Sequence, residues 1–347
     1  MRISVLIPCY NEEKTIYACV QSILTQARQA DEIIVVNDGS TDRSPEILKR
    51  FGRKIRLAHT GCNTGNKSYA QEYGFRFVTG DILVMTDGDT ILAPDFLRRI
   101  EKDFEDRNVH AVAGYIKSMR HNWITACREL DYIVGQDLHK KAQANIGALM
   151  VIPGCGGAFR TATFRAHIAF DHDTLTEDLD FTYKLHEKNL KILFDKDAVV
   201  YTQDPDTLSS YINQMRRWIG GGWQNIMKHW RVIITKPGHA LEIGLIYVEG
   251  LVFGSLFFIL PLINIFYFYR FFLGYLLMAF IVGLYGAAKR RRFDLLLWAP
   301  LFPFMLVLNS CIFFEQFIKE ALLKRRNLAW FKPERREIAN SFEPVAF

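Results

Sequence analysis

The chain has 347 residues, a formal net charge of +6 and 50% hydrophobic residues, and this length allows one or two domains. No two of its six cysteines are spaced as C-x-x-C, which argues against a zinc site and against a disulfide framework, and a reducing cytosolic setting fits. The apolar run near the N-terminus is too short for a signal peptide, so we expect the first domain to stay on the cytoplasmic side.

Short apolar segments alternate with helical periodicity over the first hundred residues. We expect strands at residues 3–8, 32–38, 54–60 and 81–87, and helices at 13–26, from Ser44 onward, at 66–78 and at 93–104. Pro45 directly after Ser44 is a typical helix start. Because the predicted strands are continuously apolar, the pattern predicts an α/β fold with a mostly parallel sheet covered by helices on both faces.

Polar residues follow three of these predicted strands, in the stretches CYNEE, NDGSTD and TDGDT. Ligands of parallel sheets bind beyond the carboxyl ends of the strands, so the three stretches predict one site. Asp87 and Asp89 are two residues apart, and two carboxylates this close repel each other unless each has a solvated partner or a cation lies between them. Mg²⁺ prefers carboxylate oxygens, and the position at a strand end in register with Asp38 favours a metal site over a solvated turn.

Later segments give weaker signals. Residues 122–138 place Trp123, Cys127, Leu130 and Val134 on one helical face, which fits a helix packed against a membrane or an ordinary packing helix. Thr176 is followed by Glu177 and Asp178 in a plain helix N-cap pattern, and we expect Asp180 to be a helix-surface residue. The Gly-Gly-Gly run at 220–222 is expected to add local flexibility.

Three apolar runs approach the length of a membrane span. They are Leu241–Leu260, Ile263–Ala287 and Leu295–Phe314. The alternative is a set of buried helices in a soluble domain. Basic clusters beside these runs, at 289–292, 324–326 and 335–336, favour the cytoplasmic membrane face over a nucleic-acid site.

The basic tail conflicts with three complete spans, which would place it outside the cell. The third run contains Pro300 and Pro303, so it could be re-entrant or interfacial. The alternative is that the preference of basic residues for the cytoplasmic side does not determine the orientation of the tail. The sequence thus divides into a cytosolic domain with interfacial helices at 1–230, apolar helices at 231–320 and a basic tail at 321–347.

Several stretches taken in order resemble the inverting glycosyltransferases of family 2, which have the GT-A fold. More narrowly, they resemble the processive membrane synthases of cellulose, chitin, hyaluronan and poly-N-acetylglucosamine. The matching stretches are SVLIPCYNEEKTI, DEIIVVNDGSTDRS, NTGNKSYAQEYG, DILVMTDGDT, NWITACRELDY, PGCGGAFR, TEDLDFTYKLHEKNLKI and QMRRW. The resemblance covers roughly residues 3–225, and its combination of motifs is far more specific than any one of them.

The resemblance implies a role for each matching residue. The nucleotide base and ribose would be held by Pro8, Tyr10 and Glu12, with Asp38 on the uracil side and Lys67 near the nucleotide. Asp87 would orient the ribose and, with Asp89, bind Mg²⁺ or Mn²⁺ on the diphosphate. The general base would be Asp178, with Glu177 as the nearest rival. Gln214, Arg217 and Trp218 would line the acceptor channel and touch the diphosphate.

The chemistry requires these residue types independently. A leaving diphosphate develops negative charge, which a dication and a guanidinium stabilise. The attacking sugar hydroxyl needs a carboxylate that takes its proton, and a single displacement inverts the anomeric centre. Trp218 could stack on a sugar ring, or Trp218, Trp223 and Trp230 could anchor an interfacial amphipathic helix; we expect both.

The resemblance also implies the partners: a UDP-sugar donor, a polysaccharide or lipid-linked acceptor, membrane lipids, and no nucleic acid. It implies a multi-pass protein of the plasma membrane with a cytoplasmic catalytic domain. Related synthases commonly have membrane helices before this domain, whereas this sequence starts almost directly with a strand, so a second copy or a partner membrane protein could complete an export channel. The alternatives are a single-transfer enzyme that acts on a lipid phosphate carrier or glycolipid, and a membrane-anchored sugar-nucleotide sensor.

Overall fold

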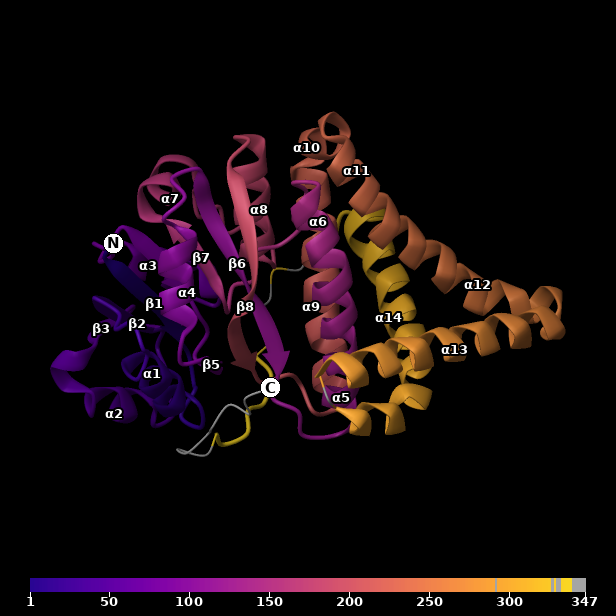
Figure 1. The fold of residues 1–347 in the computed structure, drawn as a ribbon, viewed down its shortest axis with the longest axis horizontal. Coiled ribbons are helices and arrows are strands. Elements are labelled where there is room, and N and C mark those ends of the chain that lie inside the picture. Colours follow the sequence, from indigo (N-terminus) through magenta and orange to yellow (C-terminus); the bar gives the residue numbers. More distant parts are fainter. Residues whose placement is uncertain (291, 326–327, 329–331, 339–347) are drawn as a thin grey trace. The chain divides into compact units, whose positions relative to one another are not determined.

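The computed structural model describes residues 1–290, 292–325, 328 and 332–338 (Figure 1). These residues form two units. The first contains residues 1–117, 140–203 and the described part of 328–344, and the second contains 118–139 and 204–327. Residues 332–338 therefore belong to the first unit, although nearly the whole second unit precedes them in the chain.

An eight-stranded sheet runs through the first unit in the order β3-β2-β1-β4-β7-β6-β8-β5. The strands are β1 (Ile3–Cys9), β2 (Glu32–Asn37), β3 (Arg56–His59), β4 (Ile82–Met85), β5 (Thr90–Leu92), β6 (Val109–Ser118), β7 (Gly157–Arg160) and β8 (Lys191–Thr202). Strand β1 pairs in parallel with β2 and β4, and β2 pairs in parallel with β3. The pairs β4–β7, β6–β7 and β5–β8 are antiparallel.

Helices cover both faces of this sheet, as expected from its continuously apolar strands. They are α1 (Ile16–Leu24), α2 (Ser44–Lys49), α3 (Lys67–Phe75), α4 (Phe96–Asp103), α6 (Lys141–Asn145), α7 (Thr161–His167) and α8 (Glu177–Glu187). Alternate residues of β1 enter different cores: Val5 and Ile7 pack in the cluster that contains α1, and Leu6 packs in the cluster that contains Ala70 of α3. The sheet therefore separates two hydrophobic layers.

All four predicted strands and the four early helices are confirmed. Strands β5 to β8 were not predicted from the sequence, and they make the sheet mixed by adding antiparallel pairs to its parallel half. Strand β8 contains Asp195, Lys196 and Asp197 in its middle, so it lacks the continuous apolar run that identified the first four strands.

The second unit is helical. Its helices are α5 (Trp123–Val134), α9 (Leu208–Lys228), α10 (Trp230–Thr235), α11 (Pro237–Ile243), α12 (Glu249–Ile263), α13 (Ile265–Arg290) and α14 (Phe302–Gln316). Three segments are long and apolar enough to cross a membrane: Pro237–Ile263, Ile265–Gly286 and Ala299–Leu322. They coincide with the three predicted runs. Pro300 and Pro303 lie at the start of the third, where a helix tolerates proline.

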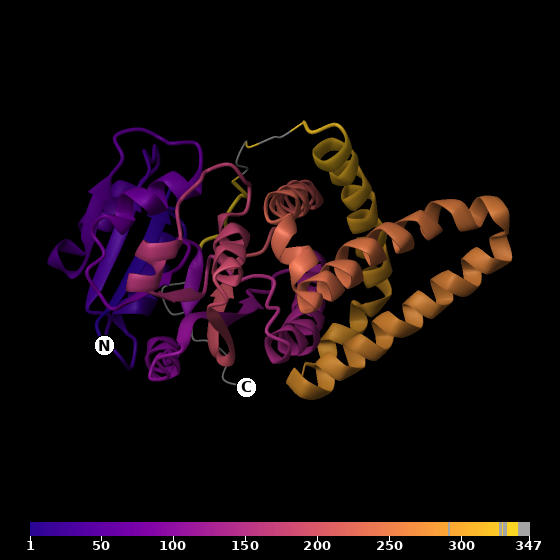
Figure 2. The same ribbon diagram turned by 90° about the horizontal axis from the view of Figure 1, so that it is seen from above.

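Helices α12 and α13 form a hairpin with Asn264 as its only connecting residue (Figures 1 and 2). Its side chains are unusually exposed for apolar groups, with Leu262 87% and Phe266 73% exposed. A contiguous apolar surface of this kind marks an interaction site, and its length and composition fit a lipid bilayer.

The buried side chain of Arg128 on α5 organises the polar interior of the second unit. Its guanidinium lies 3.0 Å from Asp131 and 3.8 Å from Asp204. The rings of Tyr132 and Trp218 lie 4.8 and 5.0 Å from its Cζ atom. One face of Trp218 is thus used by a cation–π contact within the unit, while the residue remains partly exposed.

The glycine run in α9 has a packing role in place of the expected flexibility. Residues 220–222 lie buried in a continuous helix. A Cβ atom on Gly222 would lie 2.1 Å from the hydroxyl oxygen of Tyr247, so a larger residue there would require the Tyr247 side chain to move. The basic cluster at 289–292 is also partly used inside the unit, because Lys289 pairs with Asp137 at 3.1 Å and Arg292 with Glu129 at 3.2 Å.

Candidate active site

The carboxyl ends of β1, β2 and β4 meet at one edge of the sheet, because the three strands are parallel neighbours. The loops that follow them contain Tyr10 and Glu12, Asp38, and Asp87 and Asp89 respectively. Pro8 lies within β1, opposite Val36 of β2. The parallel pairing of these strands therefore brings the three polar stretches together, as predicted.

Side-chain hydrogen bonds tie the loops after β1 and β2 to each other. Asn11 adopts the left-handed backbone conformation with φ 52°, which asparagine tolerates, and its Oδ1 accepts a hydrogen bond of 2.7 Å from the backbone N–H of Thr41. Glu12 donates its backbone N–H to Ser44 Oγ at 2.8 Å. Its buried carboxylate accepts a hydrogen bond of 2.9 Å from Thr15. These bonds fix Glu12 beneath the Asp87–Asp89 loop.

Asp38 is buried and organises the loop that leads to α3. Its carboxylate accepts hydrogen bonds of 2.8 Å from the hydroxyls of Thr60 and Thr64, and another from the backbone N–H of Thr64. Gly39 has φ +66°, and a Cβ atom there would lie 2.3 Å from the nitrogen of Asn63. The aspartate–glycine pair thus positions this loop, and contact with a uracil ring stays a prediction.

Lys67, the first residue of α3, joins two acidic elements of the site. Its Nζ lies 2.6 Å from Asp87 Oδ1 and 3.0 Å from Glu177 Oε1. The lysine side chain is only 14% exposed. The neighbouring carboxylates hold the pKa of Lys67 above its usual value in spite of burial, which by itself would lower it. Lys67 therefore carries a fixed positive charge between β4 and α8.

Asp178 lies in the first turn of α8, where the helix dipole favours negative charge. Its Oδ2 accepts a hydrogen bond of 3.1 Å from the N–H of Gly154, and its Oδ1 accepts one of 2.9 Å from Leu179. Burial, together with the charge of Glu177, raises the pKa of Asp178 to about 6, while Lys67 and the two N–H groups oppose this rise. A carboxylate with this pKa is suited to take a proton near neutral pH.

The loop that holds Gly154 against Asp178 is itself fastened to α8. Thr182 accepts a hydrogen bond of 2.9 Å from the N–H of Ile152 and donates one of 2.7 Å to the carbonyl of Asp178. His186 lies 2.7 Å from the carbonyl oxygen of Leu149. These contacts fix the position of Asp178, as a reactive group requires.

Asp89 and Glu12 pair with cations of the C-terminal segment. Arg335 forms an ion pair with Asp89, and Lys332 Nζ lies 3.2 Å from Glu12 Oε1. Sequence reasoning missed both residues and assigned Arg335 to a cluster at the membrane face. Its side chain is only 12% exposed, so that interpretation is wrong for Arg335. No local pattern marks these cations as site residues, because more than 240 positions separate each from its partner.

The donor atoms of Asp87 and Asp89 fit a hard dication such as Mg²⁺ or Mn²⁺. Oδ1 of Asp87 is buried, and Nζ of Lys67 lies 2.6 Å from it. Asp89 is 4% exposed and bonded to a guanidinium. Both carboxylates thus already interact with positive charge.

The remaining predicted site residues, Gln214, Arg217 and Trp218, lie on α9 of the second unit. Gln214 is buried and Arg217 is partly exposed. A different acidic cluster, Asp171, Asp173 and Asp180, has ligand atoms within 4.8 Å of one another.

Lys184 pairs with two of these three carboxylates. Its Nζ lies 2.7 Å from Asp171 and 2.6 Å from Asp180. Asp180, which was expected on the helix surface, is 3% exposed, so that expectation is wrong. All six cysteines are free, and burial raises the pKa of the Cys155 thiol well above its usual value, which argues against a nucleophilic role.

Known proteins resemble the chain in sequence and in fold. Residues 1–221 match the family described as glycosyltransferase like family 2. The poly-beta-1,6-N-acetyl-D-glucosamine synthase of Staphylococcus epidermidis is 26% identical over 250 residues, which cover 67% of this chain and 58% of that protein. The enzyme of the same name from Staphylococcus aureus (strain COL) is 26% identical over 229 residues, which cover 65% of this chain and 56% of that protein. The chain thus spans less than three fifths of the length of these curated relatives.

One solved structure shares the fold over nearly the whole chain. It is the mannosyltransferase PcManGT from Pyrobaculum calidifontis in complex with GDP-Man and Mn²⁺, with a TM-score of 0.66 and 21% sequence identity. The match covers 94% of this chain and 88% of that one. The GT-A fold expected from the sequence is thereby confirmed.

Replacement of Lys67 by methionine tests whether the lysine balances the acidic cluster. Lys67→Met leaves Asp87 and Glu177 without their cation, and breaking a buried ion pair typically costs about 3–5 kcal/mol. Lys67 also lowers the pKa of the buried Asp178 carboxyl, so its removal raises that folded-state pKa further above the unfolded value, and we expect the loss of stability to be larger at pH 8 than at pH 5.

Thermal unfolding in detergent at both pH values measures this difference. Lys196→Met is the control, because Lys196 is 57% exposed and pairs only with its neighbour Asp197 among the contacts described. Equal destabilisation by Lys67→Met at pH 5 and pH 8 would contradict the assigned charge balance.

Proposed function

The chain belongs to the glycosyltransferase like family 2, and from this premise we propose that it is a membrane-embedded inverting enzyme that extends a β-linked polysaccharide with sugar from a UDP-sugar donor. A glycosyltransferase of this kind uses a nucleotide-sugar donor and a sugar acceptor. The choice of UDP, the polymeric product and the use of a metal ion are part of the proposal.

The observation that carries the proposal is the position of Asp178 beside the acidic rim, the name we give to Glu12, Asp87 and Asp89 in the loops after β1 and β4. The carboxylate lies next to Lys67 and Glu177, and Lys67 in turn contacts Asp87. In this arrangement Asp178 takes the proton of the acceptor hydroxyl as that oxygen attacks the anomeric carbon. The bond from that carbon to the diphosphate breaks on the opposite side, which inverts the configuration.

Asp87 and Asp89 would hold a divalent ion, Mg²⁺ or Mn²⁺, on the diphosphate. Such an ion supplies charge stabilisation for the leaving group. The chain's own residues are proposed to do the remaining work: Lys67 adds fixed positive charge beside Asp87, and Pro8, Tyr10, Glu12 and Asp38 would hold the nucleotide. Gln214, Arg217 and Trp218 are proposed to contact the acceptor and the diphosphate.

The three long apolar helices support a location in a membrane. The names of the relatives support a polymeric product, since both act as poly-N-acetylglucosamine synthases. We propose a plasma-membrane location with the catalytic unit on the cytoplasmic side, and a homo-oligomer or a second membrane protein as the means to complete a channel.

Purified membranes that contain the protein should convert a UDP-sugar into a long product. We expect one of several radiolabelled UDP-sugars, with Mg²⁺ or Mn²⁺, to give polymer that remains at the origin in chromatography and is sized by gel filtration. A single labelled glycolipid without polymer would instead favour single transfer to a lipid carrier. Membranes that carry the Asp178→Asn variant are the control for background synthesis.

Substitution of the two neighbouring acids should separate the base from its rival. We expect Asp178→Asn to lower the transfer rate by about 10²–10⁴-fold, because it removes the proton acceptor. UDP binding, measured by calorimetry, should stay near that of the parent protein. Glu177→Gln is the matched control and should retain far more activity. Full activity in Asp178→Asn would refute the assignment.

The pH dependence of transfer should report the ionisation of Asp178. The base acts as a carboxylate, so activity should be full above its pKa of about 6 and should fall as the pH decreases through that value. Measurement of kcat/KM between pH 4.5 and 8, at constant ionic strength, tests this. A profile that stays flat down to about pH 5 would argue against Asp178 as the base, since a carboxylate at its ordinary pKa near 4 would remain ionised there.

A further inference from the structure

A short C-terminal segment, residues 332–338, lies along the acidic rim of the first unit; we call it the basic strap. Both ends of it are bonded to that unit. Lys332 lies at its start, and near its end the N–H of Ile338 donates a hydrogen bond of 3.1 Å to the carbonyl of Lys14. The Ile338 side chain is 6% exposed. The strap is thus a docked segment, and its cations have defined partners.

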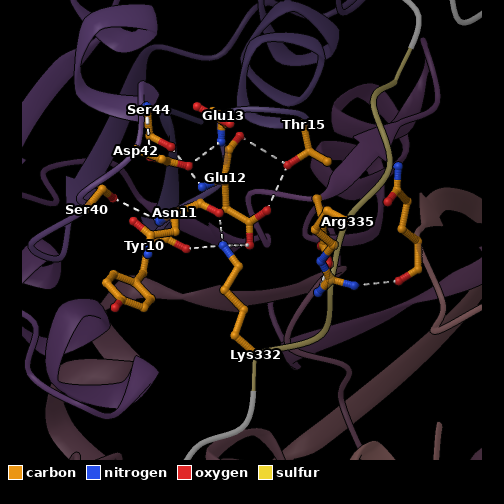
Figure 3. A network of polar contacts seen from close by, with 12 residues as sticks. Tyr10, Asn11, Glu12, Glu13, Thr15, Ser40, Asp42, Ser44, Lys332 and Arg335 are labelled. Carbon is orange, nitrogen blue, oxygen red and sulfur yellow. Dashed lines mark hydrogen bonds and ion pairs between the residues drawn. The ribbon is translucent and has the colours of Figure 1, made fainter. Parts of the chain in front are cut away.

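Lys332 fills the position beside the loop that follows β1. Its Nζ lies 3.2 Å from Glu12 Oε1 and donates hydrogen bonds to the carbonyl oxygens of Tyr10 and Asn11 (Figure 3). The same nitrogen lies 5.7 Å from the centre of the Tyr10 ring. Lys332 therefore binds the acid and the backbone of the loop that was predicted to hold the nucleotide.

Arg335 fills the position beside Asp89. Its guanidinium pairs with Asp89 and also donates a hydrogen bond of 2.9 Å to the carbonyl of Gln203. The next residue, Arg336, is held through its main chain, whose N–H and C=O groups bond to the amide of Gln203 at 3.0 and 2.9 Å. The side chain of Gln203 thus fixes the register that places Arg335 on Asp89.

The strap supplies one cation for each of two buried carboxylates. Glu12 and Asp89 are 7% and 4% exposed, and each of these buried carboxylates has one cation of the strap beside it. Two buried like charges need counter-cations to remain ionised. A divalent ion on Asp89 would provide the same compensation, so it would make the guanidinium redundant at that carboxylate and would repel it.

We propose that Arg335 is a built-in competitor of the divalent ion for Asp89, so that the docked strap sets the ion affinity of the site and ion binding releases the strap. This inference rests on the proposed function, in which the ion binds Asp87 and Asp89. Without the ion, Arg335 keeps Asp89 neutralised. With the ion bound, Arg335 leaves and the hydrogen bonds of Arg336 and Ile338 to the first unit break.

The test measures ion binding directly on the full chain in detergent, without any sugar donor. Mn²⁺ titration followed by electron paramagnetic resonance gives the Kd of the parent protein, Arg335→Gln, Arg336→Gln and Asp89→Asn. We expect Arg335→Gln to bind Mn²⁺ about tenfold more tightly, or more, because it removes the competing cation. Arg336→Gln is the matched control with the same change in net charge and should bind as the parent does. Asp89→Asn should bind much more weakly.

Hydrogen exchange of the strap provides an independent readout. The amides of Arg336 and Ile338 are hydrogen-bonded when the strap is docked, so they should exchange slowly without Mn²⁺ and faster with it. In Asp89→Asn they should exchange quickly at any Mn²⁺ concentration. Arg335→Lys keeps the charge and should retain part of the protection of these amides against exchange. Such retention would show that the effects of Arg335→Gln come from the lost charge and not from misfolding.

Two results would overturn the inference, and they differ in what they say about the proposed function. If Arg335→Gln binds Mn²⁺ no more tightly than the parent protein, and hydrogen exchange of the strap amides does not change with Mn²⁺, the competition is excluded. If Asp89→Asn nevertheless loses Mn²⁺ binding, the proposed metal site stands. Mn²⁺ binding that does not depend on Asp89 in any variant would overturn both the competition and the proposed metal site.

Discussion

The acidic rim of the first unit is balanced by cations that the chain itself supplies. Lys67 lies between Asp87 and Glu177, Lys332 pairs with Glu12, and Arg335 pairs with Asp89. Carboxylates in a buried position are costly without such partners. The chain's own cations therefore offset much of the negative charge of these acids before any ligand arrives, and a nucleotide sugar that arrives with a dication would add roughly as much positive charge as negative.

The parallel half of the sheet explains why these acids lie together. Strands β4, β1 and β2 all end at the same edge, so residues from three loops far apart in sequence become neighbours. Asp178, the proposed base, comes from a different element, the first turn of α8, and Thr182 and His186 fasten that helix to the loop that contains Gly154. The antiparallel strands added after β4 complete the sheet, and β7 ends the segment that includes this loop.

Sequence patterns identified the structural features that depend on residues close together along the chain. The apolar runs gave the first four strands and the three long helices, and the combination of polar stretches gave the family and the rim. The patterns failed where a contact between distant segments decided the outcome. Asp180 is buried and pairs with Lys184, Gly222 lies against the hydroxyl of Tyr247, and Arg335 pairs with Asp89 in the first unit.

The amino-acid sequence by itself determined the class of enzyme, the strands at the rim and the identity of the acids that line it, because periodicity and motif order are local properties of the chain. Only the tertiary structure decided which cation neutralises which acid, since long-range ion pairs form between segments whose separation along the chain leaves no periodic signal. That pairing fixes Lys67 between two acids, where its charge opposes the rise that burial causes in the pKa of Asp178, and it brings Lys332 and Arg335 back to the start of the fold.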